Sequence, residues 1–486
     1  MPKEILHIIK ELKENGFEGY AVGGCVRDLL RGVNPEDYDV ATDATPEEVQ
    51  KIFKKSFSNN EFGTVTVFTG SEKKNLKEVE VTTYRTEEEY KDKRHPERVN
   101  FVDSIEEDLK RRDFTINAIA LKPSPKQELE GSLIDPFEGR KDLQENIIRA
   151  VGDPQERFSE DALRMIRAIR FSSTFGFSIE KNTRRAVKKN AGLLKKISSE
   201  RIRDEFQKII MTERAMEGVE ELRELGVLKE FLPELLEGYK VDQSKHHIYD
   251  CYTHCIYSLD YAAKQGFNFH VRMAALLHDI GKPRTKRGEG EDATFHNHEV
   301  VGMKMTRGIL KRLKFKRRDI DKISLLVRYH LFYYNVGEVT ESSIRRLLRK
   351  VGRENIDELL QVRMADRIGS GVPKAEPYRL RHMRYLIERV SRDPITTSML
   401  DINGEEVMKE MNISPGPIVG HVLNILLLEV MNDPQRNKEE ILRERVKEMR
   451  EWGEGKIEEK GKRAKEEIDK IEEKRDEMTK KKYWVS

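Results

Sequence analysis

The sequence predicts an α+β protein in which a head of mixed strands and helices is followed by helical domains only. Within residues 1–148, the runs VTVFTG and EVEVTTYR combine β-branched residues with alternation, which is typical of strands. From about residue 150, runs such as DALRMIRAIRFSSTFG and ERIRDEFQKIIM repeat apolar residues every three or four positions, which is typical of helices. At 486 residues the chain is too long for one hydrophobic core, so several domains are expected.

Composition limits the partners and the compartment. Charged residues make up 36% of the chain but the net charge is only +3, so a nucleic acid would have to bind local basic patches. Three cysteines do not suggest a disulfide framework, and a cytoplasmic location is expected. Cys251 and Cys255 are expected to be buried helix residues rather than zinc ligands. The longest apolar run, around NILLLEVM, is too short to cross a bilayer, so no membrane partner is expected.

The run GYAVGGCVRDLLRGVNPEDYDVAT carries the parts of a nucleotidyl-transfer site. Asp37 and Asp39 are two residues apart, so on a strand they point to one side and can hold Mg²⁺ ions between them. Gly23 and Gly24 form a turn without side chains, which lets backbone N–H groups approach a phosphate. Arg27 follows at a predicted helix start, where the helix dipole favours an anion. The alternative is a surface turn with a solvated acidic loop.

Two further runs extend this predicted site. Catalysis with two metal ions needs carboxylates that hold the ions about 3.5–4 Å apart, and Glu80, on a neighbouring strand, is a candidate third carboxylate. Its alternative is a solvent-facing strand residue. In RRDFTINAIA, the guanidinium groups of Arg111 and Arg112 suit bidentate phosphate contacts and lie beside the polar residues Asp113 and Asn117. The alternative for the arginines is an ordinary surface pair.

The run SEDALRMIRAIRF offers a way to choose a base. Asp161 and Arg164 are three residues apart, so on one helix they share a face. The aspartate can accept from the exocyclic amine of cytosine or adenine, and the arginine can donate to the adjacent ring acceptor. Uracil and guanine present the opposite pattern and would leave both groups unpaired. The alternative is a common salt bridge on a helix surface.

Taken together, these runs resemble the class II tRNA nucleotidyltransferase and poly(A) polymerase family. The matching runs are GYAVGGCVRDLLRG with DYDVAT, then RRDFTINAIA, SEDALRMIRAIRF and ERIRDEFQKI, which follow the family order over roughly residues 15–215. The resemblance implies a head with the polymerase-β nucleotidyltransferase fold, followed by an all-α neck, body and tail. It implies that residues 200–206 brace the neck rather than touch substrate.

The same resemblance implies the roles of individual residues. Mg²⁺ would bind at Asp37 and Asp39. The contacts to the triphosphate would come from Gly23, Gly24, Arg27, Arg111 and Arg112. Base selection would come from Asp161 and Arg164, with Glu160 positioning the pair.

The segment YRTEEEYKDKRHPERVNFVDSIEEDL resembles the flexible loop of CCA-adding and A-adding enzymes. The predicted function is therefore template-independent addition of CCA to the acceptor arm of tRNA, with CTP and ATP as substrates. The alternatives are addition of A alone and synthesis of poly(A). Scattered basic residues on the neck and tail are expected to contact RNA phosphates, so that the acceptor arm is recognised by its shape and not by its sequence. Among these residues are Arg167, Arg170, Arg345 and Arg346.

A histidine-rich region follows the neck, and its ligand types resemble those of an HD-domain metal phosphohydrolase. The candidate ligands are His254, His278, Asp279, His298, His330 and Asp366. Imidazole and carboxylate groups suit Mn²⁺, Ni²⁺, Co²⁺ or Mg²⁺, and the adjacent His278 and Asp279 can chelate one ion and bridge to a second. Lys282 is a candidate phosphate contact, and His296 is expected to be an exposed loop residue rather than a spare ligand.

Three alternatives for this region stay open at this point. The HD fold could be a degenerate body that only binds tRNA. The HD phosphohydrolase could be the main activity, with a head that only binds nucleotide. The whole chain could be a non-catalytic RNA-binding protein.

The expected domains are the head at 1–148, a helical neck at 149–225, an HD-type helical domain at 226–375 and a helical tRNA-binding tail at 376–455. The breaker run at 414–417 is expected to interrupt the helices of the tail. Residues 456–486 are nearly all Lys, Glu and Arg, and Ile468 and Ile471 offer little to bury. This segment is expected to be a solvated charged helix or a disordered tail.

Overall fold

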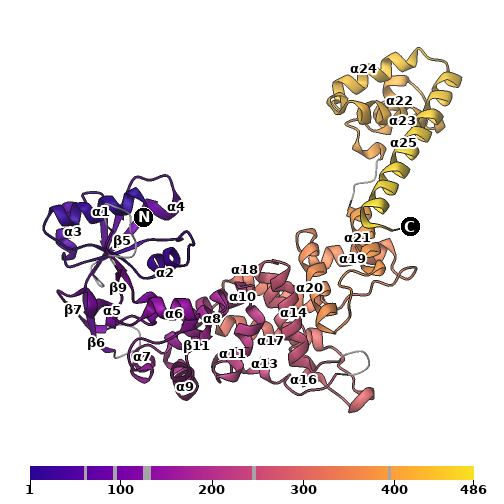
Figure 1. The fold of residues 1–486 in the computed structure, drawn as a ribbon. Coiled ribbons are helices and arrows are strands. Elements are labelled where there is room, and N and C mark those ends of the chain that lie inside the picture. Colours follow the sequence, from indigo (N-terminus) through magenta and orange to yellow (C-terminus); the bar gives the residue numbers. More distant parts are fainter. Residues whose placement is uncertain (60–62, 91–95, 124–132, 244–247, 392–395, 486) are drawn as a thin grey trace. The chain divides into compact units, whose positions relative to one another are not determined.

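The computed structural model describes residues 1–59, 63–90, 96–123, 133–243, 248–391 and 396–485 (Figure 1). The chain forms two compact units. The first comprises Met1–Leu331 and Asp357–Ala375, and the second comprises Phe332–Ile356 and Glu376–Ser486. Residues 332–356 therefore group with the tail and not with the rest of the region predicted as 226–375.

The head is built on a seven-stranded mixed sheet with the order β3-β4-β5-β2-β1-β8-β9. Its strands are β1 (Tyr20–Val22), β2 (Asp39–Thr42), β3 (Ser56–Asn59), β4 (Thr64–Phe68), β5 (Glu78–Thr83), β8 (Ala120–Leu121) and β9 (Leu133–Ile134). The pair β2 and β5 is parallel, and the other neighbouring pairs are antiparallel. The two strands predicted from β-branched alternation are β4 and β5, which confirms the mixed α+β head.

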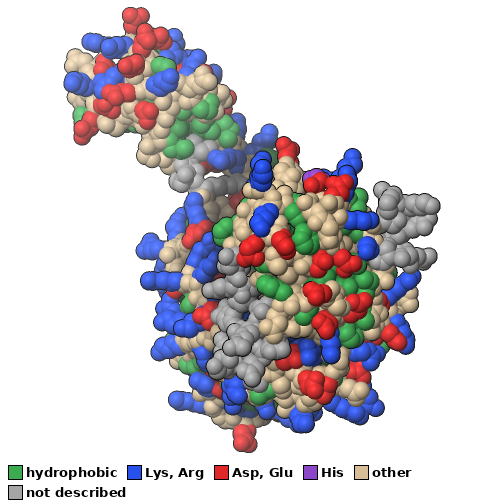
Figure 2. Space-filling view, turned by 90° about the vertical axis from the view of Figure 1, so that its left-hand side faces the viewer, with side chains coloured by type: hydrophobic (Ala, Val, Ile, Leu, Met, Phe, Trp, Pro, Cys, Tyr) green, Lys and Arg blue, Asp and Glu red, His purple; other side chains and the backbone are tan. Residues whose placement is uncertain are grey.

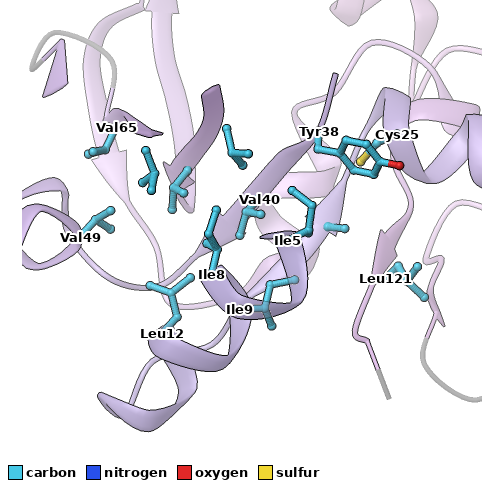
Figure 3. Packing of buried hydrophobic residues seen from close by; sticks show 14 of the residues in the cluster. Ile5, Ile8, Ile9, Leu12, Cys25, Tyr38, Val40, Val49, Val65 and Leu121 are labelled. Atoms are coloured by element: carbon cyan, nitrogen blue, oxygen red, sulfur yellow. The ribbon is translucent and has the colours of Figure 1, made fainter. Parts of the chain in front are cut away.

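Helices complete the head and cover the sheet. They are α1 (Lys3–Glu14), α2 (Gly24–Leu30), α3 (Pro46–Ile52), α4 (Lys74–Lys77), α5 (Ile105–Lys110), α6 (Gly139–Glu145) and the 3₁₀ helix η1 (Thr115–Asn117). Figure 3 shows Ile5, Ile8 and Leu12 of α1 facing Val40 of β2. Apolar residues at spacings of three and four on α1 thus bury one face of the sheet.

The candidate metal ligand Asp39 lies on the opposite face of the sheet. Ala41 belongs to a second buried cluster with Val22, Tyr84 and Leu109. Because side chains alternate along a strand, Asp39 points to the same face as Ala41, away from the face that α1 covers. Burial of Val40 on the α1 face therefore fixes the direction of the Asp39 carboxylate.

The segment that resembles a flexible loop contains regular structure. Strands β6 (Arg85–Tyr90) and β7 (Pro96–Phe101) pair antiparallel, and helix α5 follows them. Residues 91–95, between the two strands, lie outside the described residues. The prediction of a loop is therefore wrong for the two described arms, because consecutive β6 and β7 satisfy each other's backbone groups.

The neck and the body of the first unit are helical, as predicted. The neck contains α7 (Pro154–Glu160), α8 (Leu163–Phe175), α9 (Lys181–Asn190), η2 (Ala191–Lys196), α10 (Ser199–Met211), α11 (Ala215–Glu224), α12 (Leu228–Phe231) and α13 (Pro233–Leu236). The body contains α14 (Cys251–Lys264), α15 (Phe269–Leu277), α16 (Lys282–Thr285), η3 (Gly290–Asp292), α17 (His298–Arg312), α18 (Arg317–Tyr329) and α20 (Ile356–Gly369). A short parallel pair, β10 (Ile147–Ile148) and β11 (Ser178–Ile179), joins the start of the neck to the end of α8. Cys251 and Cys255 are buried on α14, as predicted.

The second unit is a helical domain with its own core. Its helices are α19 (Glu341–Val351), η4 (Arg353–Asn355), α21 (Tyr378–Ser391), η5 (Thr397–Met399), α22 (Gly404–Met411), α23 (Pro417–Asn432), η6 (Pro434–Arg436), α24 (Glu439–Arg450) and α25 (Glu454–Tyr483). The predicted breaker run follows α22, and its last residue, Pro417, begins α23.

The prediction that the charged C-terminal segment buries little is wrong. The segment forms α25, and its residues Ile457, Ala464 and Ile468 are buried in one core cluster with α22, α23 and α24. These residues recur at helical spacing, so they form one apolar stripe while the charged residues cover the rest of the helix. Because the segment as a whole has few apolar residues, this stripe was not recognised from the sequence.

Substitution of Ile468 tests whether α25 holds this domain together. Ile468→Ala should lower the free energy of unfolding of the second unit by about 2–4 kcal/mol, because the side chain leaves a cavity. Ile471→Ala is the matched control, since Ile471 is only partly buried on the same helix, and it should cost clearly less. Urea unfolding of the full chain followed by circular dichroism measures both. Equal losses from the two variants would contradict a packed role for α25.

Charges of both signs are spread over the surface. Figure 2 shows Lys and Arg side chains interspersed with Asp and Glu on the face in view, which agrees with the small net charge. Among the helices that the structure describes, none combines the length and the apolar character needed to cross a membrane.

Candidate active site and metal centre

A cleft of about 1620 Å³ is lined by residues of both the head and the neck. It brings together most of the residues predicted for nucleotide binding, namely Gly23, Gly24, Arg27, Asp37, Asp39, Arg111, Arg112, Asp113, Asn117, Asp161 and Arg164. Glu80 and Glu160 contact members of this lining: Glu80 is the strand neighbour of Asp39, and Glu160 pairs with Arg164. Runs that lie more than a hundred residues apart in the sequence therefore form one site.

Carboxylates crowd together at the start of β2. Asp39 is the first residue of β2 and is in register with Glu80 on the parallel strand β5. Burial, and then the charges of Asp37 and Glu80, raise the pKa of Asp39 to about 6. A divalent cation bound among these oxygens would offset both effects, so this donor set fits Mg²⁺.

Asp37 does not lie on the strand as predicted. It sits in a bend before β2 and is exposed, whereas Asp39 is half-buried. The strand begins only where pairing with β1 begins, at Asp39 opposite Val22. The strand-alternation argument therefore fails for Asp37, although its charge still acts on Asp39.

The turn before α2 requires a glycine at position 23, because Arg112 and Asp39 lie close to its backbone. Gly23 has φ of 75°, and a Cβ atom built there would lie 2.7 Å from Nη1 of Arg112 and 3.7 Å from Oδ2 of Asp39. Any side chain at this position would therefore strain the backbone and push against Arg112. The turn leaves backbone and guanidinium groups next to the carboxylates.

Arg27, one turn into α2, is held from three sides. Its Nε and Nη2 atoms donate to Asp28 at 2.9 and 2.8 Å, and Nη1 donates to Oδ1 of Asn117 at 2.8 Å. Its guanidinium carbon also lies 4.7 Å from the centre of the Phe175 ring. The side chain is thus oriented before any anion arrives.

Arg111 and Arg112 are organised by a residue that sequence reasoning missed. Asp108 is buried on α5 and accepts from Arg111 at 2.8 Å and from Arg112 at 3.3 Å. Burial opposes its charge, but both arginines outweigh that effect and lower the pKa of Asp108. The spacing of three and four residues on one helix was a visible signal for these pairs.

Asp113 and Asn117 contribute to the cleft through a buried network. Asp113 accepts from Nδ2 of Asn117 at 3.1 Å and from Nη2 of Arg167 at 2.6 Å. Burial raises the pKa of this carboxyl, but the charge of Arg167 and the Asn117 bond outweigh it and lower the pKa of Asp113 to about 2. Asp113 is therefore ionised and fixes two neighbours that line the cleft.

The predicted helix geometry of the base-selecting pair is wrong, although both residues line the cleft. Helix α7 ends at Glu160, and Asp161 has an extended conformation (φ −135°) before α8 begins at Leu163. Asp161 accepts from the backbone N–H of Leu163 and pairs with Arg201 of α10 through Nη2 at 2.6 Å. Arg164 pairs with Glu160 instead, and among the described residues Asp161 and Arg164 form no salt bridge with each other.

Arg164 is held by other groups. Its Nη1 donates to Oε2 of Glu160 at 2.8 Å, and its Nη2 donates to the carbonyl of Arg111 at 3.1 Å. Glu160 therefore holds the Arg164 side chain in place, and its part in base selection stays a prediction. The contact of Arg201 with Asp161 spans 40 residues, and no local spacing in the sequence indicates it.

The segment 200–206 braces the neck in part. Glu205 is buried on α10 and accepts from Nε of Arg170 at 2.6 Å, with Arg167 at 3.9 Å. Arg201 on the same segment lines the cleft, so the segment is not remote from the site. Arg167 and Arg170 also line the cleft while they pair with Asp113 and Glu205, and their contact with RNA phosphates stays a prediction.

The six predicted ligands of the body converge on one buried centre. His254 lies on α14, His278 and His330 follow α15 and α18, His298 begins α17, and Asp366 lies on α20. Their ligand atoms form two groups, His254 with His278 and Asp366, and Asp279 with His298 and His330. Within each group all ligand atoms lie within 4.8 Å of one another.

Backbone carbonyls orient three of these histidines. The Nδ1 atoms of His278, His298 and His330 lie 2.8, 2.7 and 2.7 Å from the carbonyl oxygen three residues earlier. This contact fixes the proton on Nδ1 and leaves each Nε2 lone pair for a cation. The donor set therefore fits a transition-metal ion.

A second glycine allows the helices to meet at this centre. A Cβ atom on Gly281 would lie 2.3 Å from the carbonyl oxygen of His298 and 2.6 Å from the backbone nitrogen of Gly302. Only a glycine lets the turn after Asp279 approach α17 this closely. The residue thus brings His298 next to Asp279.

Lys282 forms a salt bridge with the carboxylate of Asp279. Its Nζ atom lies 2.6 Å from Oδ2 of Asp279 and donates to Oε1 of Gln243 at 2.5 Å. Burial opposes the charge of Asp279, but Lys282 and His278 outweigh it and hold the pKa of Asp279 well below its usual range. His296 is exposed, as predicted.

Known proteins match the chain along most of its length. Residues 19–149 match the family described as the Poly A polymerase head domain, and residues 176–238 match the probable RNA and SrmB-binding site of polymerase A. Residues 251–370 match the HD domain. The CCA-adding enzyme of Ligilactobacillus salivarius (strain UCC118) is 33% identical over 455 residues, which cover 92% of this chain and 97% of that enzyme. The chain belongs to the CCA-adding enzyme family.

Other CCA-adding enzymes agree with this assignment. The enzyme of Lactobacillus helveticus (strain DPC 4571) is 51% identical over 203 residues, which cover 42% of this chain and 48% of that enzyme. The crystal structure of the Bacillus stearothermophilus CCA-adding enzyme in complex with CTP aligns with a TM-score of 0.58 and 30% identity. That alignment covers 92% of this chain and 98% of the other. The chain is thus a tRNA nucleotidyltransferase, which confirms the predicted family and enzyme class.

The matched ranges locate the parts of this CCA-adding enzyme. The head match includes Asp37, Asp39 and the arginines beside them, and the HD match includes all six converging ligands. Asp161 and Arg164 lie between the matched ranges 19–149 and 176–238, at the junction of α7 and α8. Both residues line the same cleft as the residues of the head.

Proposed function

We propose that this enzyme adds C, C and then A to the 3′ end of tRNA, from CTP and ATP, in the cleft between head and neck. One observation carries the proposal: Asp39 of the head and Arg164 of the neck line the same cleft. A nucleoside triphosphate with its phosphates near β2 would therefore bring its base toward Asp161 and Arg164. The head alone would bind a phosphate, and the neck supplies a means to choose a base.

The transfer joins the 3′-hydroxyl oxygen of the tRNA to the α-phosphorus of the nucleotide. The bond from that phosphorus to the oxygen shared with the β-phosphate breaks, pyrophosphate leaves, and the hydroxyl proton passes to solvent. Asp37 and Asp39 would hold Mg²⁺ with Glu80 beside them; bound there, Mg²⁺ supplies charge neutralisation at the phosphates. Arg27 and Arg112, already oriented by acidic or amide partners, would contact the triphosphate.

Base selection would use groups that are held in place before the nucleotide binds. Asp161, fixed by Arg201, would accept from the exocyclic amine of cytosine or adenine. Arg164, fixed by Glu160, would donate to the adjacent ring acceptor. Uracil and guanine would present a carbonyl to Asp161 and a ring N–H to Arg164, so neither contact to the base would form, which costs affinity.

The proposed RNA partner is the acceptor arm of tRNA, bound through its phosphates. Arg345 and Arg346 are exposed on α19 of the second unit, where Arg345 also pairs with Glu341, and both would contact these phosphates. The cytoplasmic location stays a prediction.

Extension with single labelled nucleotides tests this function. tRNA that ends at the discriminator base should take up label from CTP alone, and from ATP only when CTP is also present. Label from ATP alone on tRNA that already ends in CC, with no use of CTP, would identify an A-adding enzyme. Long A tails on arbitrary RNA would identify a poly(A) polymerase.

A second function is favoured by the buried centre of the body. We propose that it hydrolyses phosphate esters: a water oxygen bonds to phosphorus, the ester P–O bond breaks, and the leaving oxygen takes up a proton. The supporting observation is that all six ligand types of an HD site converge, with each Nε2 turned inward. A body that only bound tRNA would not need buried, converging histidines.

Hydrolysis by the body should be separable from nucleotide addition. With Mn²⁺, Ni²⁺ or Co²⁺, the chain should release phosphate from phosphate monoesters or open 2′,3′-cyclic nucleotides. His278→Ala should abolish this turnover, because it removes an inward Nε2, whereas His296→Ala should retain it. Asp39→Asn should lose CCA addition and keep hydrolysis. Absence of turnover with any of the metals would leave the body a structural element.

A further inference from the structure

We infer that the aromatic ring of Phe175, in the neck, orients two arginines of the head and thereby sets the affinity of the cleft for nucleoside triphosphates. The arginines are Arg27, on α2, and Arg31, the residue at which α2 ends. Phe175 acts through these side chains and is therefore a positioning residue. The inference rests on the first proposed function and deepens it, because it makes the phosphate contacts of the head depend on a residue of the neck.

Both guanidinium groups lie over the ring of Phe175. The guanidinium carbon of Arg27 lies 4.7 Å from the ring centre, and that of Arg31 lies 4.3 Å from it. Phe171, one turn earlier on α8, stacks on Phe175 with ring centres 5.6 Å apart. The arginine side chains are only 11% and 28% exposed, and a cation is attracted more strongly to an aromatic face where water is excluded.

The end of helix α8 fixes the position of this ring. The helix ends at Phe175, and Gly176 follows in the left-handed region with φ of 73°. A Cβ atom on Gly176 would collide with the guanidinium group of Arg214, so the turn needs a glycine. After the turn, Oγ of Ser172 donates to the carbonyl oxygen of Phe177 at 2.7 Å. The turn therefore holds the ring of Phe175 at the cleft, which it lines.

The two arginines need a neutral partner because they repel each other. They are four residues apart at the end of one helix, where like charges are neighbours. They share the carboxylate of Asp28, which lies 2.8 Å from Nη2 of Arg27 and 3.5 Å from Nη1 of Arg31. These three side chains together keep a net positive charge. An aromatic ring holds them without cancelling the charge that attracts a phosphate, whereas a further carboxylate would cancel it.

Arg27 keeps donors for a phosphate. Its Nε and Nη2 atoms donate to Asp28 and its Nη1 atom donates to Asn117, which leaves a second N–H on each terminal nitrogen unused by the described residues. The ring occupies one side of the guanidinium group, so a phosphate would approach from the cleft. Without the ring, repulsion from Arg31 would move Arg27 and weaken this contact.

Loss of the ring should not disturb base selection. Near the start of α8, Nη2 of Arg164 donates to the carbonyl oxygen of Arg111 at 3.1 Å, and Nη2 of Arg167 lies 2.6 Å from Oδ2 of Asp113. These contacts join the neck to the head independently of Phe175. A variant without the ring should therefore bind triphosphates more weakly and still prefer CTP to UTP.

Phe175→Leu in the full chain tests the inference. Binding of labelled CTP with Mg²⁺ is measured by equilibrium dialysis, and extension of tRNA gives kcat and KM. The Kd and the KM for CTP should each rise by about 5- to 30-fold, since a partly desolvated cation–π contact is lost. The kcat should change by less than about twofold, because a ground-state contact is removed. Phe175→Tyr keeps the aromatic face and should restore the Kd.

Phe177→Leu is the matched control. Phe177 is buried beside Phe175, with ring centres 5.6 Å apart, but among the described residues Arg27 stacks on Phe171 and Phe175 only. Its loss should lower the melting temperature while the Kd for CTP changes by less than about twofold. Phe175→Met, a second variant without a ring, replaces Phe175→Leu if circular dichroism shows that the latter is unfolded.

An unchanged Kd in the variants without a ring, an equal rise in Phe177→Leu, or no recovery in Phe175→Tyr overturns the inference. These outcomes are distinct from failure of the proposed CCA addition, because CTP binding is measured without tRNA. Weaker CTP binding in Phe175→Leu, in a parent that adds no C to tRNA, would support the positioning role and refute CCA addition. A parent that adds CCA, with a variant of unchanged Kd, would do the reverse.

Discussion

Asp39→Asn is expected to abolish nucleotide addition while making the metal-free protein more stable at neutral pH. The variant removes a carboxylate that the proposed Mg²⁺ site requires. Loss of several kcal/mol of transition-state stabilisation corresponds to a decrease of about 10³-fold or more in rate. Extension of tRNA with labelled CTP measures this loss. Glu78→Gln is the control, since Glu78 is exposed on the same strand as Glu80, and it should retain activity.

The gain in stability follows from the pKa of Asp39, which burial and the carboxylates of Asp37 and Glu80 raise to about 6. A raised pKa means that the folded state favours the protonated form. This contribution to stability is present below the ordinary pKa near 3.8 and is lost as the pH rises through about 6. The ionised side chain therefore costs about 3 kcal/mol at pH 8, and asparagine avoids this cost.

Thermal unfolding in EDTA tests whether Asp39→Asn raises or lowers the stability of the metal-free protein. Asp39→Asn should unfold at a higher temperature than the parent at pH 8, and the difference should shrink toward zero near pH 4. Mg²⁺ at pH 8 should stabilise the parent more than the variant. A variant that is less stable than the parent at pH 8 would show that the Asp39 carboxylate is not under electrostatic strain in the metal-free fold.

Arg164→Ala is expected to lose the choice between CTP and UTP while some transfer chemistry remains. A well-formed base contact contributes about 1–3 kcal/mol of discrimination, so the preference for CTP should fall by about 10- to 100-fold. Asp37 and Asp39 are unchanged in this variant, so addition should continue with a weaker preference. Competition between labelled CTP and UTP on tRNA that lacks its CCA end measures the ratio.

Arg157→Ala is the matched control for Arg164→Ala. Arg157 also pairs with Glu160, at 2.5 Å, but it is not among the residues that line the cleft. Its removal should leave the CTP preference intact. Unchanged C/U discrimination in Arg164→Ala, or equal losses in both variants, would defeat the proposal that Arg164 reads the base.

Several features of this protein were accessible from local spacing. Strands β4 and β5 and helices α1, α8 and α10 follow from periodicity, because the side chains of one segment reveal which face it buries. The site residues of β2, of α2 and of the HD region were found because their chemical types and order resemble a known family. The apolar stripe of α25 was also present in the sequence, but it was obscured by the surrounding charges.

The sequence by itself determined the kinds of elements, the family and the residue types of both sites. Tertiary structure decided how those residues meet: Asp37 lies outside β2 because pairing with β1 begins at Asp39, and Asp161 is held by Arg201 of a later helix. It also divides the two oxygens of Asp279 between two pairs of histidines. These contacts depend on where strands begin to pair and where helices cross, and such long-range packing leaves no periodic signal along the chain.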